Sequence, residues 1–303
     1  MIKRTIHISN PAYLSLRLGQ LVIKIPDSED MPGREVTRPI EDIGVLMIES
    51  HSVTITSAVL SYLLAHDVAV VTCNERHMPN GLFLNLEGNT LQSERFAAQI
   101  EASVPLRKQL WQQTVQAKIT NQGELLKFAS TAESSCMKIW AKNVRSGDPD
   151  NLEGRAAAYY WKGLFTGLPG FRRGRFEDAP NNLLNYGYAI LRAIIARSLV
   201  GSGLLPTLGI HHHNRYNAYC LADDIMEPYR PFVDKIVLEI IRKHGYDVEL
   251  TKDIKVEFLK LPVLDVLIEN LRRPLMVAAS MTTASLVKCF LGECKRISYP
   301  KLK

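Results

Sequence analysis

The apolar residues near the N-terminus are spaced as in short β-strands. Between residues 6 and 25 they recur at every second position, which is the pattern of a strand with one buried face. Thr56 can cap a helix over 57–65, and the β-branched run 68–72 predicts a further strand. This part of the chain therefore predicts a small β-rich domain with one helix.

From about residue 90 onward the apolar period becomes that of an α-helix. The pattern predicts helices at 93–102, 106–119, 124–143, 152–165, 181–200, 214–226, 231–244 and 262–292, the last with a break at Pro274. The polar stretch 85–92 is the predicted linker. We expect an α+β protein in which a small N-terminal β-rich domain (1–88) precedes a larger all-α catalytic domain (89–303).

The charge of the chain is unevenly distributed. The 303 residues include 37 Lys and Arg against 31 Asp and Glu, a formal net charge of +6. Residues 1–80 hold 7 basic and 9 acidic side chains, so they carry −2 and the remainder carries +8. A surface that binds a polyanion is therefore expected in the C-terminal part, although a small basic excess also serves solubility.

Cysteine and apolar content favour an intracellular protein. The five cysteines include no Cys-x-x-Cys pair, which argues against a disulfide framework and against a structural zinc knuckle. The N-terminus lacks the pattern of a signal peptide, and no apolar run reaches the roughly 18 residues that a membrane span needs. We expect a cytoplasmic location and no membrane partner.

A dense group of potential metal ligands lies between residues 209 and 234. Three consecutive histidines, 211–213, cannot all converge on one ion, because consecutive side chains diverge in helices and in strands. Asn214 fits the N-cap of a helix, which would place Asp224 and Glu227 on one face near the end of that helix. Two anions at a helix C-terminus are costly unless a cation compensates them.

Two interpretations of this acidic pair stay open. A divalent metal is the simplest compensating cation, and the alternative is a solvated acidic patch or a salt bridge to Arg230. Cys220, one turn before Asp224, is expected to be a small buried residue of the apolar face rather than a metal ligand.

Glu153 stands in the first turn of a predicted helix, and a basic region follows it. Between residues 155 and 197 there are seven Arg and Lys side chains against two acidic ones. The loop 167–174 combines glycines, an aromatic residue and arginines, which suits phosphate contacts, and a solvated loop is the alternative. The candidate DNA contacts are Arg172, Arg173, Arg175 and Arg230.

Together these residues indicate chemistry on phosphodiesters. Carboxylates from two helices and an imidazole form a mixed oxygen and nitrogen donor set, which suits Mg²⁺ or Mn²⁺ better than zinc. A divalent cation beside an arginine-rich surface can activate an attacking oxygen and neutralise charge on the transferred phosphate. We therefore interpret the chain as a metal-dependent enzyme that acts on nucleic acid.

Four motifs in this chain resemble those of a known family, in the same order. They are Glu153-Gly154 before an Ala-rich helix, the segment 181–191, Gly209-Ile210-His211-His212, and the segment 221–231. They resemble the CRISPR-associated integrase of spacer acquisition, the first of the numbered Cas proteins, in the form found in type II systems. The resemblance covers nearly the whole chain and implies an N-terminal β domain joined to an all-α catalytic domain.

The resemblance also implies a catalytic metal site. The family's Glu, His and acidic ligands correspond to Glu153, His212 and Glu227, and Asp224 matches a further acidic position near the metal. Many relatives have Asp where this chain has Glu227, and His211 remains a rival to His212. The implied cofactor is Mg²⁺ or Mn²⁺.

For activity, the resemblance implies that 3′-hydroxyls of a short double-stranded DNA fragment are joined to a CRISPR repeat by transesterification. It implies a homodimer and a complex with the small second Cas protein. Two alternatives stay open. One is a general metal-dependent DNase that needs neither repeat nor 3′-hydroxyl, and the other is a non-catalytic DNA-binding scaffold whose acidic cluster forms only salt bridges.

Overall fold

The structure is a computed structural model that describes residues 3–27, 32–129, 134–174 and 178–303. It divides into two compact units, Met1–Thr90 and Leu91–Lys303. The division expected from the sequence, after residue 88, lies two residues before this boundary.

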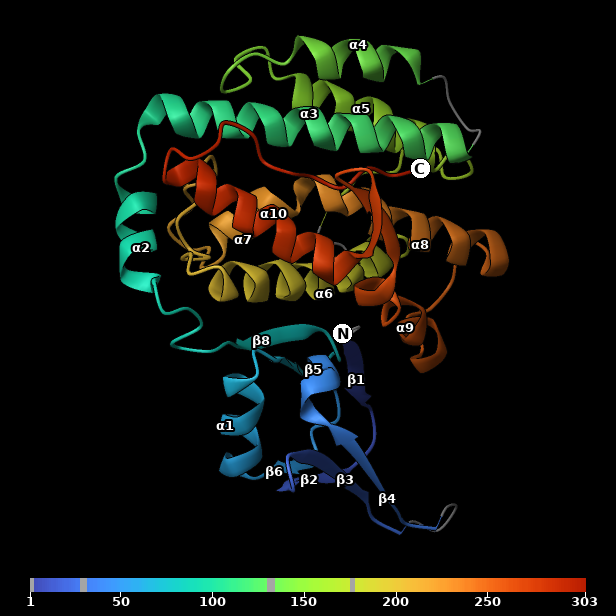
Figure 1. Cartoon of the computed structure of the whole chain (residues 1–303). Coiled ribbons are helices and arrows are strands. Elements are labelled where there is room, and N and C mark those ends of the chain that lie inside the picture. The colour runs from blue at the N-terminus through green and yellow to red at the C-terminus, as the bar shows by residue number, and fades with distance from the viewer. Residues whose placement is uncertain (1–2, 28–31, 130–133, 175–177) are drawn as a thin grey trace. The chain divides into compact units, whose positions relative to one another are not determined.

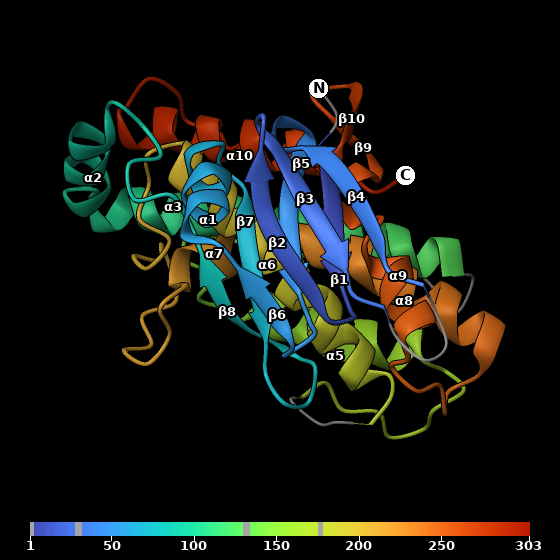
Figure 2. The same cartoon turned by 90° about the horizontal axis from the view of Figure 1, so that it is seen from below.

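The N-terminal unit contains two sheets and a helix. One sheet has the strand order β1-β5-β7-β8, in which β1, β5 and β7 are parallel, and the other has the order β4-β3-β2-β6 (Figure 2). The strands are β1 (Arg4–Ile8), β2 (Ala12–Arg17), β3 (Gln20–Ile25), β4 (Arg34–Pro39), β5 (Ile43–Ile48), β6 (Val53–Ile55), β7 (Ala69–Cys73) and β8 (Pro79–Phe83), with a 3-10 turn, η1, at Ile40–Asp42. Helix α1 (Ser57–Ala65) starts after Thr56, which accepts a hydrogen bond from Val59 N, so the predicted helix and its cap are confirmed.

The alternation along these strands builds the core of the unit. Leu14, Leu21 and Leu46 from the strands pack with Val59 and Leu63 of α1, and all five are at most 1% exposed. Burial of such apolar side chains is the main favourable term in folding a domain of this size.

The C-terminal unit consists mainly of helices (Figure 1). They are α2 (Gln92–Ile100), α3 (Val104–Ala129), α4 (Ser135–Asn143), α5 (Leu152–Leu164), α6 (Asn181–Gly201), α7 (Cys220–Met226), α8 (Arg230–His244), α9 (Lys252–Phe258) and α10 (Leu275–Phe290), with 3-10 turns η2 (Glu227–Tyr229) and η3 (Leu261–Val263) and a hairpin of β9 (Asp265–Ile268) and β10 (Leu271–Pro274). The mixed α+β fold class expected from the sequence is confirmed.

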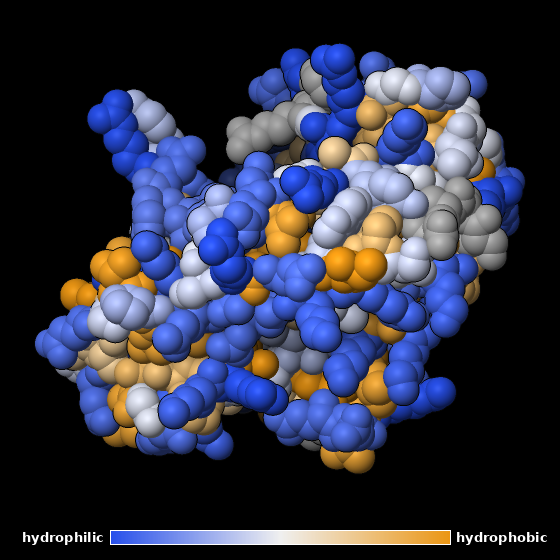
Figure 3. Space-filling model, turned by 90° about the horizontal axis from the view of Figure 1, so that it is seen from above, coloured by the Kyte–Doolittle hydropathy of each residue, from blue (hydrophilic) through white to orange (hydrophobic). Residues whose placement is uncertain are grey.

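Two helices organise this unit. Helix α6 is the one described helix long and apolar enough to cross a membrane by composition, but 72% of its most apolar window is buried inside the structure, as in the core helix of a globular unit. Helix α3 buries a stripe that includes Trp111, Val115, Lys118 and Gln122. The face of the unit that carries α3 and α4 is mostly hydrophilic, with apolar residues in small groups (Figure 3).

The structure differs from the predicted helices in two places that matter below. The stretch 265–274 is a hairpin instead of helix, because Glu269 and Asn270 take left-handed conformations, with φ of 49° and 64°, that form a tight turn. The expectation of purely helical structure after residue 88 is therefore wrong at this point. Helix α7 begins at Cys220 and not at Asn214, so the histidines lie on a longer loop than expected.

Candidate active site

Glu153 lies in the first turn of α5, where the preceding chain holds it. The Asp148 carboxylate accepts hydrogen bonds from the backbone N–H groups of Leu152 and Glu153, both at 2.9 Å. Asn151 Oδ1 accepts a further one from Gly154 N at 3.1 Å. These contacts satisfy amide groups that a helix N-terminus leaves without partners, and they fix the backbone that carries Glu153.

Lys118 of α3 links Glu153 to Glu227. Its Nζ lies 2.6 Å from Glu153 Oε1 and 2.6 Å from Glu227 Oε2. The other oxygen of Glu227, Oε1, accepts a hydrogen bond from Arg230 Nε at 2.8 Å. The structure thus brings together two of the predicted ligands, from α5 and from the η2 turn, around one cationic nitrogen.

These four groups form an alternating row of charges. Burial opposes the ionisation of Glu227, but Arg230 and Lys118 outweigh it and lower the pKa of the carboxyl to about 2. Burial also disfavours the Lys118 ammonium, yet Glu227 and Glu153 raise its pKa above the ordinary value. The salt bridge between Glu227 and Arg230, one of the interpretations left open by the sequence, is present.

His212 is held by Asp224. The ring Nδ1 lies 2.5 Å from Asp224 Oδ1, and the backbone N–H groups of His211 and His212 donate to the same carboxylate at 2.9 and 3.3 Å. Asp224 is fully buried, and its hydrogen bond to His212 raises the pKa of that imidazole. Because these donors occupy both oxygens of Asp224, the geometry suits this residue to orienting His212 more than to holding a cation.

The loop before His212 is packed too tightly for an ordinary side chain at Gly209. A Cβ there would lie 2.4 Å from His212 O and 2.8 Å from Asp224 Oδ2. Gln99 of α2 fixes the start of the loop, since its Nε2 donates to the carbonyls of Leu205 and Leu208, both at 3.0 Å. The glycine of the Gly-x-x-His motif is therefore required because no larger residue fits at this position.

His211 and His212 have different surroundings. The His211 ring stacks on Trp111, with centroids 4.1 Å apart and planes at 1°. The His212 ring is fixed through Nδ1, and its Nε2 makes no hydrogen bond with any residue that the structure describes. This contrast favours His212 over His211 as a ligand, which stays a prediction.

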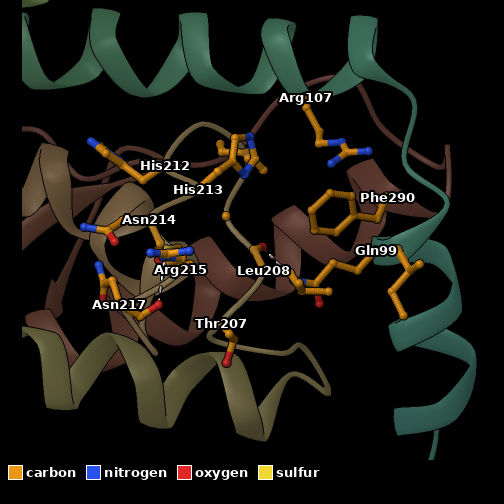
Figure 4. A pocket seen from close by; sticks show the side chains of 14 residues that line it. Gln99, Arg107, Thr207, Leu208, His212, His213, Asn214, Arg215, Asn217 and Phe290 are labelled. Atoms are coloured by element: carbon orange, nitrogen blue, oxygen red, sulfur yellow. Dashed lines mark hydrogen bonds between the residues drawn. The ribbon is translucent and has the colours of Figure 1, made fainter.

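A cavity of about 360 Å³ adjoins His212 (Figure 4). His213 and Arg215 from the loop line it, and Arg107 of α3 and Phe290 of α10 project toward it from the other side. Two guanidinium groups beside an imidazole suit an anionic group such as a phosphate.

Arg173, a predicted DNA contact, is held by α6. Its guanidinium donates to Asn185 Oδ1 at 2.8 Å and to Asn181 Oδ1 at 3.2 Å, and it lies 5.0 Å from the centroid of the Tyr188 ring. Arg173 thus anchors the loop that precedes α6.

The other predicted arginines differ in exposure. Arg230 is held by Glu227 and lies 4.5 Å from the Tyr188 ring centroid, whereas Arg172 is exposed. Arg175 lies outside the described residues. Of Arg172 and Arg230, Arg172 is the side chain exposed to solvent, and its contact with DNA stays a prediction.

Two residues of the site escaped the sequence motifs. Lys118 and Trp111 both lie on the buried stripe of α3, with Val115 between them. A lysine on an apolar helix face is the signal that would have found Lys118, because a buried ammonium needs an anionic partner.

In the described part of the chain no group of three or more His, Cys, Asp or Glu side chains is already arranged to hold a metal. Lys118 Nζ lies between two of the predicted ligands, Glu153 and Glu227.

Two solved structures have a fold similar to that of this chain. A casposase bound to its integration product superposes with a TM-score of 0.81 at 20% identity, covering 98% of this chain and 92% of that one. A chain of a complex described as Cas6-RT-Cas1–Cas2 superposes with a TM-score of 0.73 at 18% identity, over all of this chain and 37% of that one. At such identities the likeness concerns the fold.

Sequence comparison then gives the family. The family profile described as CRISPR associated protein Cas1 matches residues 6–255. The CRISPR-associated endonuclease Cas1 of Neisseria meningitidis serogroup C (strain 8013) is 38% identical over 261 residues, 86% of this chain and 83% of that protein. The chain belongs to the CRISPR-associated Cas1 family, so the family predicted from the four motifs is confirmed, and the chain is an enzyme of the endonuclease class.

Proposed function

We propose that this protein inserts short DNA fragments into a CRISPR repeat array by transesterification at 3′-hydroxyl ends, using Mg²⁺ or Mn²⁺ held by Glu153, His212 and Glu227. One observation carries the proposal. Two carboxylates from separate elements converge on a single cationic nitrogen, 2.6 Å from each. Endonucleolytic cleavage is the hydrolytic form of the same chemistry.

The residues present fit a hard divalent cation. Glu227 Oε2 is buried and lies 2.6 Å from the Lys118 ammonium, and a carboxylate oxygen with one such contact keeps a second lone pair for a cation. Carboxylate oxygens with one imidazole nitrogen are the donors that Mg²⁺ and Mn²⁺ accept. When bound, such an ion would favour ionisation of the attacking hydroxyl and stabilise negative charge on the phosphate.

The protein's own groups prepare this site. Asp224 fixes the orientation of His212 through Nδ1 and leaves Nε2 as the donor atom. Arg230 holds Oε1 of Glu227, so the carboxylate cannot rotate freely. The guanidinium groups of Arg107 and Arg215 at the neighbouring cavity would bind DNA phosphates.

The partners follow from the family and the related structures. The integration product in the casposase structure supports DNA as the substrate, and the Cas1–Cas2 complex supports the small second Cas protein as a partner. We propose that the protein forms a homodimer and works in the cytoplasm, and that the arginines at 172, 173, 175 and 230 serve the DNA surface directly or through the loop that they stabilise.

A joining assay tests the proposed function. Purified protein with Mn²⁺ should join a duplex with 3′-hydroxyl ends to a plasmid that contains the repeat, and a duplex with 3′-deoxy ends should not be joined. Glu153→Gln should abolish joining, and Glu257→Gln, at an exposed glutamate on α9, should leave it intact.

Three results would contradict the proposal. Full joining by Glu153→Gln would remove the assigned site. Nicking that depends on neither the repeat nor a 3′-hydroxyl would indicate a general DNase. Strong, salt-sensitive DNA binding without turnover would indicate a scaffold.

A further inference from the structure

The Lys118 ammonium occupies the point at which the two predicted carboxylate ligands meet. We propose that Lys118 is an internal cation that holds Glu153 and Glu227 together in the metal-free protein and that a divalent cation must displace. Lys118 thereby sets the metal affinity of the site. The inference rests on the proposed function, because it presupposes that Glu153 and Glu227 are metal ligands.

The contacts of Lys118 show that one group serves both carboxylates. The distance of 2.6 Å from Nζ is the same to Glu153 Oε1 and to Glu227 Oε2. Both oxygens would be needed by a cation that binds these residues, at about 2.0 to 2.2 Å from each. An ammonium and a divalent ion cannot share that position, since they would overlap and repel each other.

The burial of Glu227 explains why this carboxylate needs a cation beside it when no metal is bound. Glu227 is 6% exposed, and a buried carboxylate with too few partners is strongly destabilising. Lys118 comes from the buried stripe of α3 and neutralises this charge. The site can therefore stay folded and closely spaced before a metal binds.

Two cations act on Glu227, and they differ in how firmly they are held. Arg230 donates to Oε1, and its guanidinium also lies over the Tyr188 ring, 4.5 Å from the centroid. Lys118 carries a single point charge at the end of a four-carbon stem, contacts Oε2 at 2.6 Å and has no planar fork that a ring can hold. Lys118 is thus the cation that can leave, while Arg230 keeps the carboxylate in place.

Mn²⁺ binding to the DNA-free protein, measured by titration calorimetry and by the electron paramagnetic resonance signal of free Mn²⁺, tests this role. Lys118→Met should bind Mn²⁺ at least about tenfold more tightly than the wild type, because one unit charge at contact distance is worth more than that factor. Lys118→Gln, which keeps a polar group between the carboxylates, serves if the methionine variant does not fold. Lys138→Met, at an exposed lysine of α4, is the matched control and should bind like the wild type.

A second measurement uses the unaltered protein. Acylation of lysines followed by mass spectrometry should show Lys118 protected without metal and more reactive with Mn²⁺, while the reactivity of Lys138 stays constant. Unchanged or weaker Mn²⁺ binding by the Lys118 variants, or unchanged Lys118 reactivity, would overturn the inference.

The Glu153→Gln variant separates the two proposals. If it loses the Mn²⁺ binding that the wild type shows, the metal site stands, and the Lys118 variants decide the inference alone. If the wild type and Glu153→Gln bind Mn²⁺ equally, or neither binds it, the proposed metal site fails and the role of Lys118 fails with it.

Discussion

Each unit of this protein contains a buried carboxylate that holds a histidine, and the two pairs differ in how much of the imidazole reaches solvent. In the N-terminal unit Glu49 holds His7, whose side chain is 7% exposed, and Oε1 also lies 3.4 Å from His77 Nδ1. In the helical unit Asp224 holds His212, whose side chain is 46% exposed. The same contact therefore stabilises a sheet in one unit and presents an imidazole to solvent in the other.

The local structure explains this difference. His7 is on β1 and Glu49 directly follows β5. Because these strands are parallel neighbours, the two residues lie together at the carboxyl ends of the strands. His212 is on the loop before α7, where Gly209 permits a close approach to Asp224. A buried pair has no room for a ligand, and a half-exposed one does.

The largest expected effect comes from removing the two imidazoles separately. His212→Ala should lower the rate of Mn²⁺-dependent joining by about 10² to 10³, as expected for loss of one electrostatic catalytic group. Its loss of stability should be smaller than that of His7→Ala, because Asp224 keeps two backbone donors and solvent can reach the place of the half-exposed imidazole. His7→Ala should leave the joining rate close to that of the wild type and lower the free energy of unfolding by about 1 to 3 kcal/mol, because Glu49 loses a buried partner.

Joining rates and denaturant unfolding of both variants check this prediction. If His7→Ala lost as much activity as His212→Ala at equal stability, exposure would not distinguish the two pairs.

Asp234 extends the comparison to a carboxylate held by neutral groups. Tyr160 and Tyr188 donate to it at 2.7 and 2.5 Å, and burial raises the pKa of Asp234 to about 6, whereas two cations lower that of Glu227 to about 2. A carboxyl whose pKa is raised on folding contributes stability below its unfolded pKa, near 4, and loses the contribution as the pH rises through about 6.

The unfolding free energy of the wild type relative to Asp234→Asn should therefore fall by about 2 kcal/mol between pH 4 and pH 6.5. Urea titrations across this range measure it. A difference that stayed constant or rose with pH would show that Asp234 is charged at no cost in the folded protein.

The motifs that carry the candidate ligands could be recognised in the sequence because they are local. The three-residue spacing of Asp224 and Glu227 and the Gly-x-x-His motif were recognisable from residue types alone. Lys118 was not, since it meets Glu153 and Glu227 only through the packing of α3 against α5 and the η2 turn. Tertiary contacts of this kind leave only an indirect signal, a charged residue on an apolar stripe.

One local prediction failed because a side chain had a competing partner, and one tertiary contact left no pattern in the sequence. Asn214 Oδ1 accepts from Tyr216 N and stabilises a turn, so α7 starts six residues later. Leu302 N, near the C-terminus, donates to Asn121 Oδ1 of α3 at 3.0 Å, a contact between distant residues that their spacing does not indicate. The partner of Asn214 lies two residues away along the chain, whereas the partner of Leu302 is brought close only by folding.

The smallest expected effect concerns the carboxylate that orients His212. In Asp224→Asn one acceptor oxygen is replaced by a donor, so at least one of the three donors at this site loses its partner and the imidazole is held less firmly. Loss of a group that orients a metal-binding histidine typically weakens metal binding by about 10- to 100-fold. The Mn²⁺ concentration for half-maximal joining should rise by that factor, and the rate at saturating Mn²⁺ should recover most of the wild-type value.

Asp247→Asn, at an exposed aspartate after α8, is the control and should shift neither the Mn²⁺ requirement nor the saturating rate. A fall in the saturating rate without a change in the Mn²⁺ requirement would instead place Asp224 in the chemical step, and the contrast with Glu49 would then rest on catalysis and not on orientation.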